Sequence, residues 1–428
     1  MTIRLEITNL LNEAVGEHGL SAGHIAALDE RVAALRARLR AERAQGQHGY
    51  LNLPANSDML ESTLRVTQAR LGRFKHLVVL GIGGSSLGVR TLAQSMGATV
   101  DLHVVDNTDP ALLTEVRRVI DLKSSLFVVT SKSGGTMETV VALGYFVGEL
   151  RKAGLPLKDH LIAVTDPDAG ALRAFANAHD LDTGDIPPEV GGRFSVLSAA
   201  GLLPAALMNI DIAALLEGAA ATEQLCTESE ATEDWAARLG LLMADLCERG
   251  KSSLVFMPYS SRLGYLSDWF VQLWDESLGK NQTRDGRDAH IGQTAIRAVG
   301  ATDQHSQLQL FLEGPNDKVL LFVKIDRHGA DFRLGDFEWD AFGAGYVKGK
   351  SPGEVLNAQL AGTAQGCAER SRPNATLVLP RLDGRAMGEL LMGLQIATTY
   401  AGYVLDVNPY DQPGVELGKR ISRRMLGA

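Results

Sequence analysis

The chain has 428 residues, 45% hydrophobic and 22% charged, which is typical of a globular protein with about two or three domains. Its formal net charge of −9 argues against a broad surface for nucleic acid or an anionic membrane, so we expect neither partner. The three cysteines are too few and too widely spaced for a disulfide framework or a zinc site, and they favour a cytoplasmic location. The N-terminal residues do not resemble a signal peptide, and no apolar stretch is long enough to span a bilayer.

The first predicted element is an amphipathic helix over residues 22–44. Its apolar residues recur at helical spacing among arginines and glutamates: Ile25, Leu28, Val32, Leu35 and Leu39. We expect residues 1–50 to form a helical arm that packs on the body of the protein.

From residue 76 onward, apolar strands alternate with helices. The predicted strands are HLVVLG, DLHVVD, SLFVVTS and HLIAVTD, with helices near 86–96, 110–120 and 136–153 between them. Continuous apolar strands with helical crossovers predict a parallel sheet covered by helices on both faces. We expect residues 51–222 to form this first α/β domain.

A Pro/Gly-rich connection over 182–194 precedes helices near 195–222 and 231–249, and the strand-and-helix order then repeats. In the second half we expect the strands SSLVFMPYS, SQLQLFLEG, DKVLLFVKI and ATLVLP, and helices near 262–278, 353–370 and 385–404. Residues 329–352 are predicted to be irregular, and a short helix begins near Pro413. Residues 223–428 are therefore expected to form a second α/β domain that ends in a C-terminal helix.

The chain is organised around residues 76–88, HLVVLGIGGSSLG, where a strand leads through a glycine turn into a helix. Such a turn binds anions, because glycines let backbone N–H groups approach the ligand and the helix N-terminus adds positive potential. Ser85 and Ser86 can donate hydroxyls to the anion or cap the helix. A dinucleotide fingerprint is the competing interpretation, but its third glycine is Ser86 here, which favours a phosphate loop without a nucleotide.

A second Ser/Gly loop, Ser131-Lys132-Ser133-Gly134-Gly135-Thr136, follows the strand SLFVVTS. Its backbone N–H groups and hydroxyls can bind phosphate, and the same donors can cap the following helix. Ligands of parallel sheets lie beyond the C-terminal ends of the strands, where both loops fall. Two such loops predict one doubly ionised group that is held from two sides.

Three further candidates cannot be settled from periodicity. Arg193 follows two glycines, which would let its guanidinium turn into a cleft, although such an arginine by itself is more often at the surface or in an ion pair. Gln272 and Glu276 share a helix face opposite the apolar residues, which favours a solvated ion pair between Glu276 and Lys280. His305 precedes a predicted strand, where a lone histidine is usually structural.

Taken together, these segments resemble the glucose-6-phosphate isomerase family over about residues 50–425. The motifs occur in the family's order: GIGGSSLG, VVTSKSGGTMET, VGGRFSVLSAAGLLP, GQTAIRAVGATDQHSQ and GYVLDVNPYDQPGVELGK. The resemblance implies two sugar isomerase (SIS) domains, each a parallel sheet flanked by helices, and a compact bacterial form of the enzyme. It agrees with the order of elements predicted above.

The resemblance also implies which residues bind substrate. Gln272 and Gln412 would position the sugar. The implied phosphate ligands are Ser85, Ser131, Lys132, Ser133 and Thr136. Gly135 stands where many members carry threonine, which implies one hydroxyl fewer in this loop.

The catalytic roles follow from the same resemblance. Glu276 would be the base that moves a proton between C1 and C2, and Arg193 would stabilise the enediolate. His305 and Lys419 would open the sugar ring. An aldose–ketose shift needs a carboxylate beside the proton and a cation near the oxyanion, but no hydride transfer, so we expect neither cofactor nor metal.

The family forms homodimers, which implies that His305 reaches the active site of the neighbouring subunit. The expected reaction interconverts glucose 6-phosphate and fructose 6-phosphate. A dual glucose and mannose phosphate isomerase is an alternative, because the preference between C2 epimers depends on the shape of the pocket. A SIS protein that binds sugar phosphates without turnover is a second alternative, and a nucleotide-dependent oxidoreductase is a third.

Overall fold

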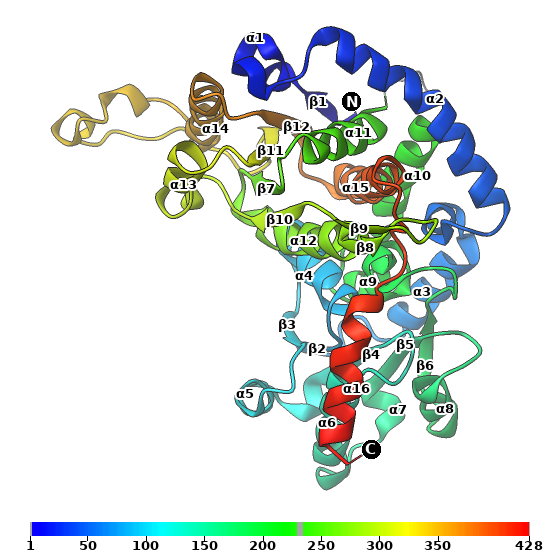
Figure 1. Ribbon diagram of the computed structural model, residues 1–428. Coiled ribbons are helices and arrows are strands. Elements are labelled where there is room, and N and C mark those ends of the chain that lie inside the picture. Colours follow the sequence, from blue (N-terminus) through cyan, green and yellow to red (C-terminus); the bar gives the residue numbers. More distant parts are fainter. Residues whose placement is uncertain (1, 229–233, 428) are drawn as a thin grey trace.

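Two β-sheets, each covered by helices, form the body of the protein (Figure 1). The computed structural model describes residues 2–228 and 234–427. Within these ranges no helix combines the length and the apolar character needed to cross a membrane.

The first sheet is entirely parallel, with strand order β3-β2-β4-β5-β6. Its strands are β2 (His76–Leu80), β3 (Asp101–Val105), β4 (Ser125–Thr130), β5 (Leu161–Thr165) and β6 (Asp182–Asp185). The helices of this half are α3 (Ser57–Gln68), α4 (Gly84–Met96), α5 (Pro110–Val119), α6 (Met137–Lys152), α7 (Leu157–His160), α8 (Ala171–Ala178) and α9 (Ala199–Leu207).

Alternate residues of the central strands face two different cores. In β2, Leu77 and Val79 belong to the large core that also contains residues of α4 and α9. Val78 and Leu80 belong to a second core with residues of α5 and α6. Burial on both faces explains why the strand is a continuous apolar run rather than an alternating one.

The second sheet has strand order β1-β12-β11-β7-β10. Its strands are β1 (Arg4–Glu6), β7 (Ser253–Pro258), β10 (Thr294–Arg297), β11 (Lys318–Arg327) and β12 (Asn374–Arg381). All pairs are parallel except β1 on β12. The helices of this half are α10 (Ile212–Glu228), α11 (Trp235–Glu248), α12 (Gly264–Leu278), α13 (Leu308–Glu313), α14 (Pro352–Glu369) and α15 (Gly384–Val404).

The N-terminal arm consists of β1, the short helix α1 (Asn12–Val15) and the long helix α2 (Ala22–Ala44). The predicted helix over 22–44 is confirmed, and Ser21 caps it by accepting a hydrogen bond from the His24 backbone. The arm also adds the edge strand β1 to the second sheet, which the helical pattern did not predict.

The two halves share one hydrophobic core, which contains residues from both sheets and from the helices between them. Helices α4 and α12 pack against each other between the sheets (Figure 1). Helix α10 packs mainly on α15 of the second half. The division of the chain at residues 50 and 222 stays a prediction.

Two local predictions were wrong or incomplete. Residues 306–314 were expected to form a strand but contain helix α13, because Leu308, Phe311 and Leu312 face the core at helical spacing while Leu310 is exposed. The expected helix over 231–249 begins at Trp235 where it is described, and 231–233 lie outside the described residues.

Two segments extend from the body. The predicted irregular stretch between β11 and α14 contains only the 3-10 turns η8 (Trp339–Phe342) and η9 (Gly345–Val347), and it projects to one side (Figure 1). At the C-terminus, η10 (Pro413–Val415) leads into α16 (Glu416–Met425), and every residue from 413 to 427 is exposed.

Candidate active site

The first Ser/Gly loop connects β2 to α4. Gly83 has a φ of 62°, a conformation that favours glycine. Ser86 is buried and donates its hydroxyl to the Gly83 carbonyl at 3.1 Å, so its role is structural. Ser85 is half-buried in the first turn of α4, which leaves it as the serine that this loop can offer to a ligand.

The hydroxyls of the second loop lie together at the start of α6. Thr136 Oγ1 is 3.1 Å from Ser131 Oγ and 3.5 Å from Ser133 Oγ. Thr136 is the N-cap residue of α6, yet no side chain caps this helix. The hydroxyls and the first N–H groups of α6 therefore converge at one helix N-terminus, the arrangement that binds phosphate.

Lys132 points away from this group of hydroxyls. Its ammonium donates to the carbonyls of Pro188 and Val190, the latter at 3.0 Å. Burial lowers the pKa of Lys132, while the charges of Asp166 and Glu189 oppose that change. The Lys132 side chain thus binds the segment that leads to Arg193. Only the backbone of Lys132 remains beside the hydroxyls of the loop.

Arg193 lies in the 3-10 helix η5 (Gly192–Leu197), and its side chain is only 3% exposed. Its Nε donates to Ser277 Oγ at 2.7 Å, and its Nη1 donates to Gln412 Oε1 at 3.0 Å. Its Nη2 donates to the carbonyls of Pro409 and Asp411. These acceptors hold the buried guanidinium in one orientation. A surface arginine has no such set of fixed acceptors.

Glu276 lies directly in front of this cation, near the end of α12. Its Oε1 is 3.3 Å from Arg193 Nη1, and its Oε2 accepts a hydrogen bond from Gln272 Nε2 at 3.1 Å. The carboxylate is 28% exposed, so it is oriented by two partners while one side stays open to a ligand. A partly exposed carboxylate and a fixed cation are therefore in contact.

The expected solvated pair between Glu276 and Lys280 is wrong. Lys280 Nζ donates to the backbone carbonyl of Glu276 at 2.8 Å and to that of Asp411 at 2.7 Å. Burial lowers the pKa of Lys280, and the charge of Arg193 lowers it further. Periodicity failed here because the polar face of α12 meets another part of the chain instead of water.

The first loop packs directly against these residues. A Cβ atom on Gly83 would lie 2.8 Å from Gln272 Nε2, and one on Gly84 would lie 2.0 Å from the carbonyl oxygen of Gly192. The backbone contact requires glycine at position 84, whereas the positive φ favours glycine at position 83. This contact brings the loop that carries Ser85 to the group formed by Arg193, Gln272 and Glu276.

His305 and Lys419 lie apart from this group. His305 is exposed in the 3-10 helix η7 (Thr302–His305), which directly precedes α13. Lys419 is exposed on α16, where its Nζ donates to Glu416 Oε1 at 2.7 Å. Within the described part of the chain, neither side chain forms a hydrogen bond or ion pair with Glu276 or Arg193.

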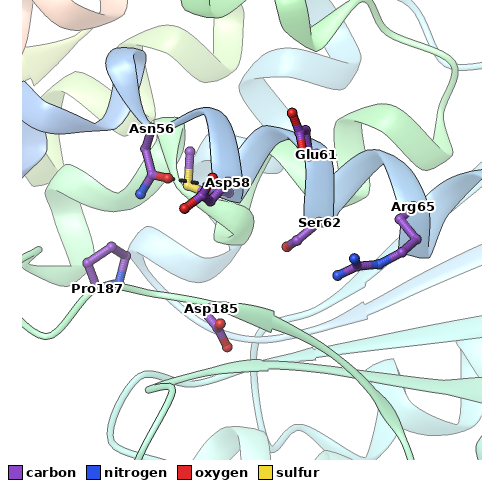
Figure 2. A pocket seen from close by; sticks show the side chains of 8 residues that line it. Asn56, Asp58, Glu61, Ser62, Arg65, Asp185 and Pro187 are labelled. Carbon is purple, nitrogen blue, oxygen red and sulfur yellow. Dashed lines mark hydrogen bonds between the residues drawn. The ribbon is translucent and has the colours of Figure 1, made fainter.

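Two pockets lie near these elements. One, of about 530 Å³, lies between α3 and the end of β6 and is lined by Asp58, Glu61 and Asp185 (Figure 2). Arg65 also lines this pocket, but the three acids outnumber it, so the net negative charge disfavours a phosphate dianion. The other, of about 410 Å³, is lined by Lys280 and Asp411 and borders the acceptors of Arg193. Among the described residues, no group of three His, Cys, Asp or Glu side chains could hold a metal ion.

Comparison with known proteins identifies the family of this chain. The family model described as phosphoglucose isomerase matches residues 66–427. The chain belongs to the phosphoglucose isomerase family. It is therefore an aldose–ketose isomerase, and the predicted resemblance is confirmed.

Relatives of the phosphoglucose isomerase family cover nearly the whole chain. The glucose-6-phosphate isomerase of Carboxydothermus hydrogenoformans is 36% identical and aligns over 100% of this chain and 95% of its own. The crystal structure of a hypothetical protein from Thermus thermophilus has a TM-score of 0.89 and 37% identity, with complete coverage of both chains. A glucose-6-phosphate isomerase structure from Chlamydia trachomatis has the same fold, with a TM-score of 0.83, 24% identity and coverage of 98% and 91%.

The phosphoglucose isomerase motifs did not reveal every residue that shapes this site. Ser277, Lys280 and Tyr410 were missed as contributors, and only Tyr410 lies inside a motif quoted for the family. Ser277 and Lys280 follow Glu276 in the sequence ESLGK. Tyr410, between the Pro409 and Asp411 carbonyls that accept from Arg193, lies in NPYDQP. Adjacency to Glu276 and Gln412 was the only signal that could have indicated them.

Proposed function

We propose that this chain interconverts glucose 6-phosphate and fructose 6-phosphate, with Glu276 as the base and Arg193 as the cation that stabilises the intermediate. The observation that carries the proposal is the contact of 3.3 Å between these two side chains, beside the loop that carries Ser85. Three free cysteines, none of them exposed, support a cytoplasmic location.

The phosphate of the substrate would bind at the start of α6 and beside Ser85. Ser131, Ser133 and Thr136 would donate hydroxyls, while the helix N-terminus would supply backbone N–H groups. Binding the remote phosphate would orient C1 and C2 against Glu276. Gln272 and Gln412, which contact Glu276 and Arg193, would position the sugar hydroxyls.

Isomerisation would proceed by proton transfer. Glu276 would remove the proton from C2 of the open aldose, so that the C2–H electron pair forms the C1–C2 double bond and the C1 oxygen becomes an enediolate oxygen. Arg193 would stabilise this negative charge. The protonated Glu276 would then return the proton to C1, while the hydroxyl proton at C2 moves to the C1 oxygen and leaves a ketone at C2.

Ring opening is assigned to His305 and Lys419, and we propose that His305 comes from a second subunit. In its own chain, His305 is exposed and has no bond to Glu276 among the described residues, which supports a homodimer with reciprocal active sites. Lys419 would approach from α16, which follows Gln412 by a few residues.

The role of Glu276 is tested by Glu276→Gln. The variant keeps the acceptor for Gln272 but cannot take a proton, so we expect kcat to fall by on the order of 10²-fold or more while substrate still binds. Near-normal turnover would remove Glu276 from the mechanism. The assay starts from fructose 6-phosphate and detects both glucose 6-phosphate and mannose 6-phosphate, so a dual activity would be visible.

The shared site is tested by subunit mixing. Glu276→Gln and His305→Ala proteins are unfolded together and refolded as an equal mixture. If the site is shared, half the dimers are mixed and half of their sites are intact, so about a quarter of wild-type activity returns. If both residues act within one chain, every site keeps one substituted residue and the mixture stays inactive. An independent measurement of subunit exchange confirms that mixed dimers have formed.

A further inference from the structure

The segment 408–412 supplies backbone carbonyls that accept hydrogen bonds from the Arg193 guanidinium. Arg193 Nη2 donates to the carbonyl of Asp411 at 3.1 Å and also to that of Pro409. Lys280 donates to the Asp411 carbonyl from the other side at 2.7 Å. Since these acceptors are backbone atoms, the position of the guanidinium depends on the position of the 408–412 segment.

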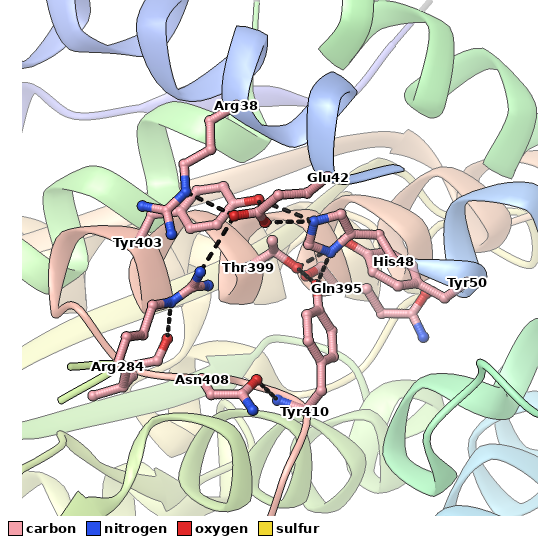
Figure 3. A network of polar contacts seen from close by, with 11 residues as sticks. Arg38, Glu42, His48, Tyr50, Arg284, Gln395, Thr399, Tyr403, Asn408 and Tyr410 are labelled. Carbon is pink, nitrogen blue, oxygen red and sulfur yellow. Dashed lines mark hydrogen bonds and ion pairs between the residues drawn. The ribbon is translucent and has the colours of Figure 1, made fainter. Parts of the chain in front are cut away.

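Tyr410 lies between the two carbonyls that accept from Arg193, and it anchors the segment elsewhere. Its hydroxyl is 2.5 Å from His48 Nδ1 and 2.9 Å from Thr399 Oγ1. Figure 3 shows the ring of Tyr410 extending from the 408–412 segment toward His48 and Thr399. The segment is thus held by cations on its carbonyls and by one phenol hydroxyl.

His48 is fixed in turn by the last turns of α2. Its side chain is fully buried, and its Nε2 is 2.9 Å from Glu42 Oε2. Glu42 also accepts from Arg38 Nε at 2.8 Å and from the Tyr403 hydroxyl at 2.6 Å. An ionised carboxylate can only accept, so we assign the proton to His48 Nε2, and Nδ1 then accepts from the Tyr410 hydroxyl.

We propose that Tyr410 and His48 are positioning residues for the isomerisation: through the 408–412 segment they set the Arg193 guanidinium against Glu276. The N-terminal arm, which contains none of the proposed catalytic or substrate-binding residues, thereby becomes part of the active site. This inference rests on the proposed role of Arg193. Loss of the Tyr410 hydroxyl frees the segment to turn, and the guanidinium moves with its acceptors.

The test compares Tyr410→Phe with Tyr50→Phe. Both tyrosine hydroxyls contact the same Thr399 Oγ1, Tyr50 at 2.8 Å, but only Tyr410 belongs to the segment that holds Arg193. We expect Tyr410→Phe to lower kcat by on the order of 10-fold with KM changed less than about 3-fold, since small misplacements of catalytic groups are costly. Tyr50→Phe should keep kcat near the wild-type value. Equal kcat values for the two variants would overturn the proposal.

A double-mutant cycle with Arg193→Lys shows whether Tyr410 acts through the guanidinium. In that background, Tyr410→Phe should cost less than about 2-fold, because the group it positions is already gone. The same loss of about 10-fold in both backgrounds would overturn the proposal. His48→Asn serves as a second variant if Tyr410→Phe does not fold, since His48 has a φ of 58° that asparagine tolerates.

Two further measurements distinguish a loss of positioning from a loss of stability, and failure of this inference from failure of the proposed function. Thermal unfolding of both Tyr variants should show similar small losses, which ties a kcat difference to position rather than to stability. If Glu276→Gln retains activity, the proposed function fails. If Glu276→Gln is inactive while Tyr410→Phe equals Tyr50→Phe, only the present inference fails.

Discussion

Gly84 offers a sharp test of how the first loop meets Arg193. A Cβ at this position would lie 2.0 Å from the carbonyl oxygen of Gly192 and 2.4 Å from its carbonyl carbon. Both atoms are backbone, so no side chain can move aside. Real Cβ contacts are essentially never shorter than 3.0 Å, so in Gly84→Ala the loop and Gly192 must separate by about 1 Å.

The separation should affect activity more than stability. Overpacking of this kind typically costs about 1–3 kcal/mol, which a chain of this size can tolerate. A shift of about 1 Å between the loop and the Arg193 backbone, however, can cost on the order of 10²-fold in rate. We therefore expect kcat/KM for fructose 6-phosphate to fall by about that factor, with thermal unfolding recorded alongside.

The matched control is Gly192→Ala. A Cβ on Gly192 has no heavy atom within 4 Å, so the same chemical change on the other side of the same contact meets open space. This variant should keep kcat/KM within about 3-fold of wild type. If the two variants behaved alike, the reasoning that close approach of these two glycines aligns the site would be refuted.

Three further predictions concern the phosphate site, ring opening and acid stability. The double variant Ser133→Ala/Thr136→Ala should raise KM for fructose 6-phosphate and weaken inhibition by inorganic phosphate; an unchanged KM would mean that these hydroxyls do not bind substrate. His305→Ala should be slow on cyclic hexose phosphate but far less impaired on an open-chain substrate, and equal losses would place His305 in the proton transfer or in structure. Burial alone raises the pKa of Glu42, but hydrogen bonds from its neighbours, led by Tyr403, lower it from 4.5 to about 2. The ionised carboxylate therefore stabilises the fold above pH 4.5, and this stability is lost as the pH falls toward 2. Urea unfolding should therefore show Glu42→Gln to be less stable than wild type at pH 7, by at most about 3 kcal/mol, with a gap that closes below pH 4.5; a gap independent of pH would contradict the assignment.

The sequence by itself determined the fold class and the family. Strand β2 is a continuous apolar run because both of its faces are buried, and helix α2 has its apolar residues at helical spacing because only one face is buried. Both patterns are local consequences of burial and can be read along the chain. The positions of the two Ser/Gly loops followed from the same rule, since parallel strands end at one edge of their sheet.

Local pattern failed where two periods were compatible with the same residues. The alternation of Leu308, Leu310 and Leu312 predicted a strand, but Phe311 completes a helical stripe that the core selects. The prediction for Glu276 failed for a different reason. Periodicity shows that one face of α12 is polar, but it does not show whether water or another part of the chain covers that face.

Only the tertiary structure decided how the site is assembled. Arg193 reaches its acceptors near Gln412 across 219 residues, and Tyr410 reaches His48 across 362. A hydrogen bond between such distant residues leaves no trace in composition or spacing, because it places no constraint on the sequence neighbours of either partner. These contacts arise when the two halves close over their shared core, which brings η5, α12 and the 408–412 segment to one place.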